Sequence, residues 1–175
     1  MLYHASQVSG LTVLLPQTST HQTPYVYAIR GRLTALCFGA PKDDFDLLMD
    51  EEEGRPVLWE CYPGAFRRIY GGKSCSLYAV KETGFLQGKT GWAPELVCPE
   101  AVPVLWEERI PDLFLVLSQA AEAGECILHA YSRSPDYQAM LREELTWRIR
   151  QLGLTRAQLN AGRSFPEELD RLLFP

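Results

Sequence analysis

Short apolar segments separated by proline and glycine fill the first 110 residues, and this pattern limits the possible folds more than any other feature. The segments have the length of strands, and clear helical periodicity begins only after Glu108. A run of strands followed by a run of helices predicts an α+β protein and argues against a parallel, doubly wound sheet. We therefore expect two small, mostly antiparallel sheets that face each other across a cleft within residues 1–110.

Turn residues delimit the expected elements of this region. Pro63 and Gly64 predict a hairpin between two strands. The segment 71–74 predicts a further turn and is no phosphate-binding loop, because it lacks the first glycine of the Walker pattern and a strand follows it. We expect a short helix over 32–38, and strands over 2–6, 25–29, 57–62, 65–70, 75–80, 96–98 and 102–106.

Helical periodicity dominates the chain after residue 110. Ser134 and Pro135 predict the start of the longest helix, 136–152, and Gly153 predicts its end. We interpret residues 1–110 as the core of the protein and 111–175 as a mainly helical extension packed on that core. The other elements expected here are helices over 112–123, 156–161 and 165–173 and a strand over 126–131.

Composition and charge exclude several classes of protein. At 175 residues, with 46% apolar and 22% charged residues, the chain suits a single globular domain. The formal net charge of -5 makes nucleic acid an unlikely partner. We find no apolar run long enough to cross a bilayer and no signal-peptide pattern, so we expect a cytoplasmic protein without a membrane partner.

Neither the cysteines nor the acidic residues form a metal-binding pattern. The five cysteines are widely spaced without a CxxC pair, and we expect buried, reduced thiols. The acidic run between residues 43 and 53 lacks the glycine and the spacing of a calcium loop. We interpret this run as an exposed loop or a helix end, with Phe45 and residues 47–49 available to pack one helical face.

A histidine and a tyrosine stand on two expected strands that flank a polar segment. His4 lies on the first strand and Tyr27 on the second, and residues 17–24 between them are too polar for a core. This arrangement predicts a pocket beside the two strands. The alternative is that Tyr3, Tyr25 and Tyr27 fill a β core and that His4 is an ordinary hydrogen-bonded strand residue.

These residues carry a resemblance to a known fold. The segment Leu-Tyr-His-Ala-Ser at 2–6, followed by Tyr-Val-Tyr-Ala-Ile at 25–29 and a small helix, resembles the amino-terminal half of the ADP-ribosyltransferase fold. It is most similar to the branch with a His-Tyr-acid triad, which includes the small rifampin-inactivating transferases and, more remotely, the tRNA 2'-phosphotransferases. The resemblance extends over residues 2–110.

The resemblance implies NAD as a substrate and a role for each matching residue. In the fold that the chain resembles, the first-strand histidine and its neighbours hold a ribose and the nicotinamide amide, which here implies His4, Ala5 and Ser6. A tyrosine stacks on the nicotinamide ring, which implies Tyr27 with Tyr25 beside it. A carboxylate contacts the nicotinamide ribose, and we assign that acid to Glu95, just ahead of an aliphatic strand.

Three positions depart from the family pattern. Ala5 stands where the family has glycine, and Ile29 stands where it has serine or threonine. In the rifampin transferases the acid comes earlier in the chain, and Gln87 occupies the corresponding place here. We therefore expect Glu95, rather than Gln87 or Glu82, to be the residue that places a carboxylate nearest the cleft, and we expect the large ring of Trp92, in the turn before Glu95, to wall the pocket.

Three classes of function remain open. The first is an ADP-ribosyltransferase or NAD glycohydrolase, which transfers ADP-ribose to an unknown acceptor, such as a protein, or to water. The second is an inactive member of the same fold that binds a nucleotide or a protein partner. The third is a small interaction protein in which the resemblance reflects core patterning alone. A carboxylate in a cleft beside His4 favours the first class, and the absence of any cleft there would leave only the third.

Overall fold

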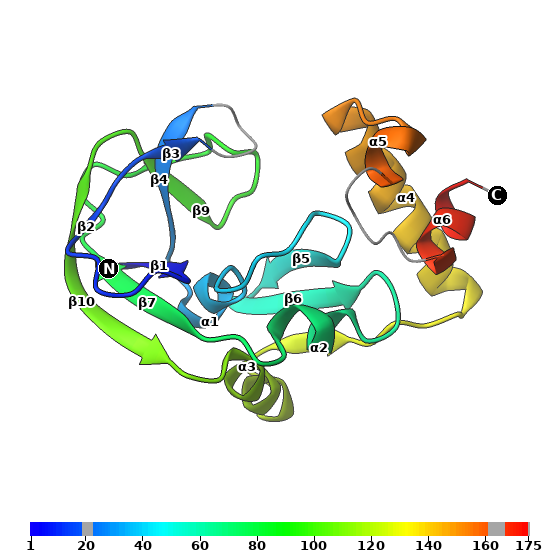
Figure 1. Ribbon diagram of the computed structural model, residues 1–175, viewed down its shortest axis with the longest axis horizontal. Helices are drawn as coiled ribbons and strands as arrows, with labels where there is room; N and C mark the ends of the chain where they lie inside the picture. Colours follow the sequence, from blue (N-terminus) through cyan, green and yellow to red (C-terminus); the bar gives the residue numbers. More distant parts are fainter. Residues whose placement is uncertain (19–22, 161–166, 175) are drawn as a thin grey trace.

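The computed structural model of the protein describes residues 1–18, 23–160 and 167–174, which form two β-sheets with helices around them (Figure 1). This arrangement confirms the predicted α+β class, with one large antiparallel sheet and one small mixed sheet. Among the described helices, none combines the length and the apolar character that a bilayer crossing requires.

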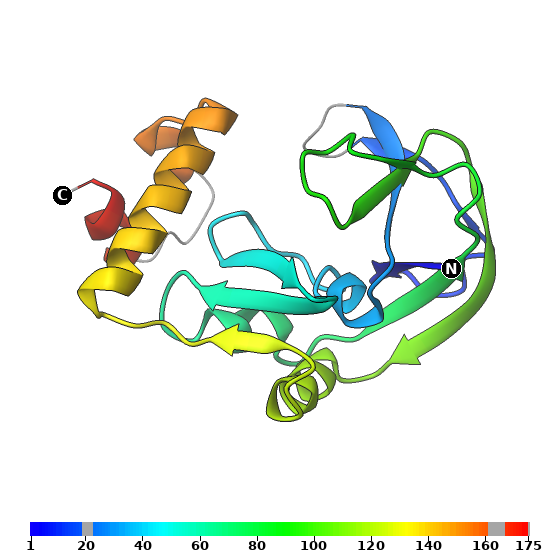
Figure 2. The ribbon, with the colours of Figure 1, turned by 180° about the vertical axis from the view of Figure 1, so that it is seen from behind.

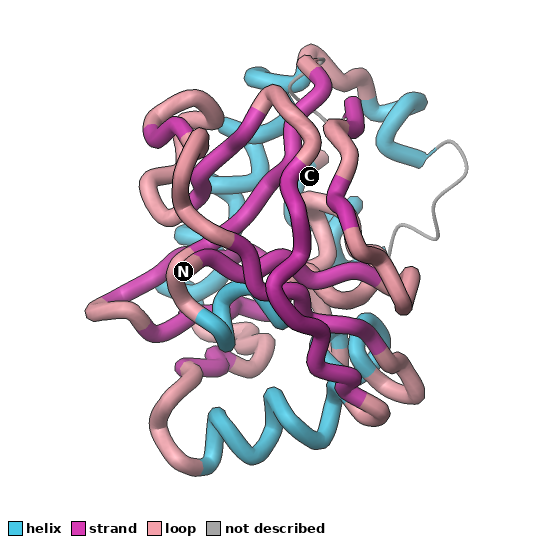
Figure 3. The backbone as a smooth tube through the Cα atoms, turned by 90° about the vertical axis from the view of Figure 1, so that its left-hand side faces the viewer, coloured by secondary structure: helices cyan, strands magenta, loops and turns pink. Residues whose placement is uncertain are grey.

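The larger sheet has eight strands in the order β2-β10-β7-β1-β4-β9-β8, with β3 paired to β4. Its pairings are antiparallel. Figure 3 shows the strands of this sheet from the side opposite the C-terminal helices. The strands are β1 (Leu2–Ser6), β2 (Val13–Leu14), β3 (Gln17–Thr18), β4 (Pro24–Ile29), β7 (Cys75–Val80), β8 (Leu86–Gln87), β9 (Glu95–Cys98) and β10 (Val102–Ile110).

The smaller sheet has three strands in the order β11-β6-β5. β5 (Leu47–Glu52) and β6 (Arg55–Glu60) form an antiparallel hairpin, whereas β11 (Ile127–His129) runs parallel to β6. We expected both sheets to lie within residues 1–110, so the third strand of this sheet is a correction. A parallel strand requires a long crossover, and the chain from α2 (Ala65–Tyr70) to α3 (Leu113–Glu122) between β6 and β11 provides it.

Six helices are seen in the described residues, and most follow the predicted pattern. The longest begins at a proline in its first turn and ends at Gly153, whose φ of 62° is the left-handed conformation that ends many helices. The helices are α1 (Arg32–Leu36), α2 (Ala65–Tyr70), α3 (Leu113–Glu122), α4 (Pro135–Leu152), α5 (Arg156–Asn160) and α6 (Glu167–Leu173). The predicted start of the last helix at 165–166 lies outside the described residues.

The segment 65–70 is a helix, and the predicted strand there was wrong. Its buried residues, Ala65, Phe66, Ile69 and Tyr70, recur with the spacing of one helical face, while the two arginines between them are exposed. The buried carboxylate of Glu60 accepts a hydrogen bond from the Phe66 backbone N–H at 2.9 Å. An acidic group at this first turn satisfies a helix N–H and stabilises the helix.

Residues 47–52 of the acidic run form strand β5, where the interpretation as a loop or helix end was wrong, whereas residues 43–46 form a loop and turn as that interpretation allowed. Leu47 and Leu48 are buried, and the acidic side chains follow where the strand leaves the core. Glu53 and Gly54, at φ of 51° and 78°, join Glu52 to Arg55 in a two-residue turn. Positive φ at both positions is the geometry of a type I′ hairpin turn, and Glu-Gly is a weaker signal for it than Asn-Gly.

Two clusters of buried apolar residues lie on opposite faces of the large sheet. One cluster includes Leu2, Val26 and Leu96. The other fills the space between the large sheet, the small sheet and the helices, and it includes Leu141 and Leu145 of α4. All five cysteines are buried and free, as predicted. The core that begins in the N-terminal strands therefore continues into the C-terminal helices. Figure 2 shows these helices on the far side of the small sheet from the large sheet.

We predict that Leu145→Ala lowers the free energy of unfolding of the whole protein by about 2–5 kcal/mol, the usual cost of removing a fully buried leucine side chain. Urea denaturation followed by far-UV circular dichroism measures this change. The matched control is Leu115→Ala on α3, because Leu115 is 50% exposed and its loss should cost less than about 1 kcal/mol. Equal effects from the two substitutions would show that α4 is not anchored through this core.

Candidate functional site

A cavity of about 750 Å³ lies on the face of the large sheet that looks toward the small sheet and α4. The strands β1, β4 and β9 form one wall, β5 and the segment after α1 form a second, and α4 forms a third. The residues around it include Tyr3, His4, Ala5, Tyr27, Ile29, Phe38, Lys42, Asp44, Met49, Thr90, Trp92, Glu95, Trp147, Arg148, Gln151 and Leu152. Its volume lies within the range of small-molecule binding sites.

His4 lies where the large sheet divides. β1 pairs with β7 over its whole length, but only Tyr3 of β1 is in register with a residue of β4, namely Ile29. Beyond this pair, β4 turns away from β1 (Figure 1). The Nδ1 atom of His4 lies 2.8 Å from the backbone oxygen of Tyr27 and must donate, because a carbonyl oxygen only accepts. The imidazole thus bridges the strands where the backbone ladder stops.

The protonation of His4 follows from this position. Burial lowers the pKa of His4, while its hydrogen bond to the Tyr27 carbonyl acts in the opposite direction. The ring is therefore neutral at pH 7, with its proton on Nδ1. The Nε2 atom then carries a lone pair and can accept a hydrogen bond from a hydroxyl group of a ligand.

Tyr27 and Glu95 share one face of the sheet. Ile29 is in register with Glu95 and also with Tyr3, and Tyr27 lies two residues before Ile29 on the same strand. Because paired residues and alternate residues point to the same side, all four side chains leave the sheet toward the cavity. His4 begins on the other face and reaches the Tyr27 backbone across the gap between the strands. The structure thus brings His4, Tyr27 and Glu95 to one cavity from three neighbouring strands.

Not all of the predicted site residues reach the cavity. Ala5 lines it, but Ser6 and Tyr25 are not among the residues around it. The Ser6 hydroxyl accepts a hydrogen bond from the Val8 backbone N–H at 3.1 Å. Tyr25 contacts the edge of the Tyr27 ring, with centroids 6.2 Å apart and planes at 88°. Tyr25 therefore packs against the Tyr27 ring without lining the cavity itself.

Two carboxylates and the buried hydroxyl of Thr90 border the cavity. Glu95 and Asp44 line it, whereas Gln87 and Glu82 do not. Glu82 instead forms an ion pair with Arg30. Thr90 Oγ1 is buried at the cavity wall and has no hydrogen-bond partner among the described residues. A buried hydroxyl of this kind normally has a partner, so it marks a place where a ligand or water can bind.

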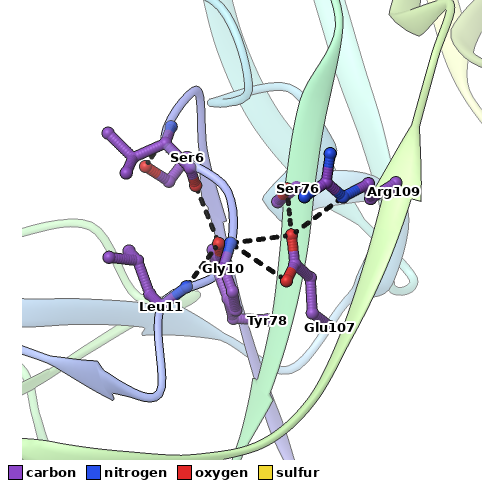
Figure 4. A network of polar contacts seen from close by, with 8 residues as sticks. Ser6, Gly10, Leu11, Ser76, Tyr78, Glu107 and Arg109 are labelled. Carbon is purple, nitrogen blue, oxygen red and sulfur yellow. Dashed lines mark hydrogen bonds and ion pairs between the residues drawn. The ribbon is translucent and has the colours of Figure 1, made fainter.

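The loop after β1 is fixed by a polar network on the large sheet (Figure 4). The Glu107 carboxylate accepts hydrogen bonds from the Ser76 hydroxyl at 2.6 Å and from the Gly10 backbone N–H at 3.1 Å. The Tyr78 hydroxyl donates to the Val8 carbonyl at 2.7 Å and accepts from the backbone N–H of Leu11 at 3.2 Å. This network holds the chain where it leaves β1, and so it limits the movement of the strand that carries His4.

Sequence reasoning missed the walls that lie outside β1, β4 and β9, apart from Trp92. Lys42 and Asp44 come from the segment between α1 and β5, and Trp147 and Arg148 come from α4. The helical periodicity of α4 predicts a helix but does not show which of its partly exposed side chains face a cavity. The sequence did predict that Trp92 could wall the pocket, and Trp92 lines it.

No protein-family model, curated protein or solved structure gives a significant match when compared with this chain. The assignment of a function therefore depends on the geometry of the cavity and on the chemistry of its residues. Within residues 1–18, 23–160 and 167–174 there is also no group of three or more histidine, cysteine or acidic residues that could hold a metal ion.

We predict that His4 makes the stability of the protein pH-dependent. Its pKa in the folded protein lies below the ordinary value of 6.5, so the unfolded chain takes up the proton more readily. The stability contributed by neutral His4 is present above about pH 6.5 and is lost as the pH falls toward the folded pKa. The difference in unfolding free energy between wild type and His4→Asn should therefore shrink from about pH 8 to about pH 5.

The matched control for this pH series is His129→Asn, because His129 is exposed on β11 and lies outside the cavity. This variant removes one histidine as His4→Asn does, so it shows how much of the change with pH is specific to His4. A constant difference between wild type and His4→Asn would contradict the assignment of a buried, neutral imidazole.

Proposed function

We propose that this protein binds NAD in the cavity and transfers ADP-ribose to an acceptor or to water. The observation that carries the proposal is that His4, Tyr27 and Glu95 line one cavity from three neighbouring strands. A hydrogen-bonding imidazole, an aromatic ring and a carboxylate are the groups that this chemistry requires. The unpartnered hydroxyl of Thr90 in the same wall gives a further polar contact for a ligand.

Each residue has a distinct task in the proposed reaction. Tyr27 supplies an aromatic platform for the nicotinamide ring, and the Nε2 atom of His4 accepts a hydrogen bond from a ribose hydroxyl. The bond between C1' of the ribose and the nicotinamide nitrogen breaks, and its electron pair leaves with neutral nicotinamide. The Glu95 carboxylate stabilises the positive charge that develops on the ribose. The acceptor then bonds to C1' and releases a proton.

A second candidate is a protein that binds a nucleotide without turning it over. Ala5 and Ile29 favour it, because both line the cavity where the family that the chain resembles has glycine and a hydroxyl residue. The methyl group of Ala5 limits how closely a ligand amide can approach the backbone. Incubation with NAD separates the two candidates, because only the first releases free nicotinamide. Binding of ADP-ribose without that release would select the second.

We predict that Glu95→Gln lowers the rate of nicotinamide release by about 100-fold or more and leaves NAD affinity nearly unchanged. The substitution keeps the shape of the side chain and removes the charge that stabilises the transition state alone. Chromatographic assay of nicotinamide and calorimetric titration with NAD measure the two quantities. Glu100→Gln, an exposed glutamate just after β9, is the matched control. An unchanged rate in the Glu95→Gln protein would remove Glu95 from the proposed mechanism.

We predict that Tyr27→Ala weakens binding of NAD by about 1–3 kcal/mol, the usual contribution of one ring stacked on an aromatic side chain. Calorimetric titration with NAD measures the loss. The matched variant is Tyr27→Phe, which retains the ring and should retain most of the affinity. If both variants bind NAD as the wild type does, the ring has no stacking role.

A further inference from the structure

Two cations line the cavity on the walls that face the large sheet. Lys42 comes from the segment between α1 and β5, and Arg148 comes from α4. In the described part of the chain, neither side chain forms an ion pair with a carboxylate. Two partly buried positive charges without a paired acid are unusual, because burial of a charge is costly unless it is compensated.

The contacts of both side chains leave them able to bind a ligand. The Lys42 ammonium lies 4.4 Å from the centre of the Phe38 ring, which is a cation–π contact and not an ion pair. Arg148 Nη1 donates a hydrogen bond to the Asp44 carbonyl at 2.8 Å. This bond uses one of the five N–H donors of the guanidinium group and fixes its position. Positioned guanidinium and ammonium groups are typical phosphate ligands in proteins.

The electrostatics of the pair favour an anion. Burial lowers the pKa of Lys42, and the positive charge of Arg148 acts in the same direction. Asp44 and Asp46 act against this lowering of the pKa, and the effect of Asp44 is larger than that of Arg148. Asp46 accepts hydrogen bonds from the Tyr62 hydroxyl and from the Asp43 backbone N–H, and Asp44 is exposed. The Cys37 thiol is neutral, because burial raises its pKa. A bound anion would relieve the repulsion between the two cations.

Aromatic side chains next to the cations indicate what else the ligand contains. The rings of Phe38 and Trp92 lie with centroids 5.8 Å apart, and Phe38 also contacts Lys42. Trp147, which is 57% exposed, borders the cavity one residue before Arg148. Flat apolar surfaces beside two cations suit a ligand that combines a ring with a phosphate group.

We propose that Lys42 and Arg148 form a phosphate-binding subsite that holds a phosphate group of a nucleotide between the segment after α1 and helix α4. This inference deepens the proposed function, and it rests on that function only in taking the ligand to be a nucleotide. The phosphate-binding subsite therefore includes helix α4, which lies outside the resemblance at residues 2–110.

Calorimetric titration with ADP-ribose, ADP and inorganic pyrophosphate tests the subsite. Lys42→Gln and Arg148→Gln should each weaken binding of ADP-ribose and ADP by about tenfold or more, since each removes a charged hydrogen-bond donor. Arg150→Gln on the same helix and Lys73→Gln are the matched controls, because both side chains are exposed outside the cavity and the change of charge is equal. The controls should bind as the wild type does.

Further measurements separate this inference from the proposed function. Lys42→Arg keeps the charge and should keep most of the affinity, which guards against a Gln variant that fails to fold. If ADP and pyrophosphate bind through both cations but NAD releases no nicotinamide, the transferase activity is disproved and the subsite stands. If either Gln variant folds and binds ADP-ribose as tightly as the wild type, the subsite is overturned. It is also overturned if the wild type binds none of the three probes.

Discussion

The hydrogen bond from the His4 imidazole to the Tyr27 carbonyl joins the two parts of the large sheet where β1 and β4 separate. Without it, the Tyr27 carbonyl would lose this hydrogen bond in a partly buried place, which costs free energy. The bond also fixes the tautomer of His4 and the orientation of the Tyr27 backbone. The shape of the cavity wall and the chemistry of the imidazole therefore depend on the same contact.

The remaining walls depend on how the C-terminal part of the chain is attached. The buried carboxylate of Glu60 accepts a hydrogen bond from the Tyr131 backbone N–H at 3.1 Å, and the Glu60 carbonyl lies 3.0 Å from the Tyr137 hydroxyl. These bonds tie the segment that enters α4 to strand β6 and to the start of α2. With Leu141 and Leu145 in the common core, they set the position from which Arg148 reaches the cavity. Residues far apart in the sequence thus form one site.

Sequence reasoning succeeded where local pattern decides structure. The strands at 2–6, 25–29 and 75–80 were predicted because turn residues separate short apolar segments, and α4 was predicted from its capping residues and periodicity. It failed at α2, where two buried pairs separated by arginines were interpreted as a strand after a Pro-Gly turn. It also failed at β5, because acidic residues were given more weight than the buried Leu47 and Leu48.

The candidate site was predictable only in part, for a similar reason. His4, Tyr27 and Glu95 could be selected because they lie on strands whose neighbours are set by the sheet. Lys42 and Arg148 could not, since their positions depend on how a connecting segment and a helix pack in three dimensions. The parallel pairing of β11 with β6 also joins segments that are far apart in the sequence, and no local sequence pattern predicts it.

Helix α4 is held unequally along its length. Its middle carries the buried Leu141 and Leu145, whereas Trp147, Gln151 and Leu152 in its last turns are exposed along the border of the cavity. Segments with few buried contacts open at lower free-energy cost than the core around them. Ile149 still packs against the core in these last turns, so this end of α4 keeps an anchor while its cavity-facing side has few buried contacts. A ligand that touches both walls would add contacts to this side of the helix, and so it would hold the cavity wall in place.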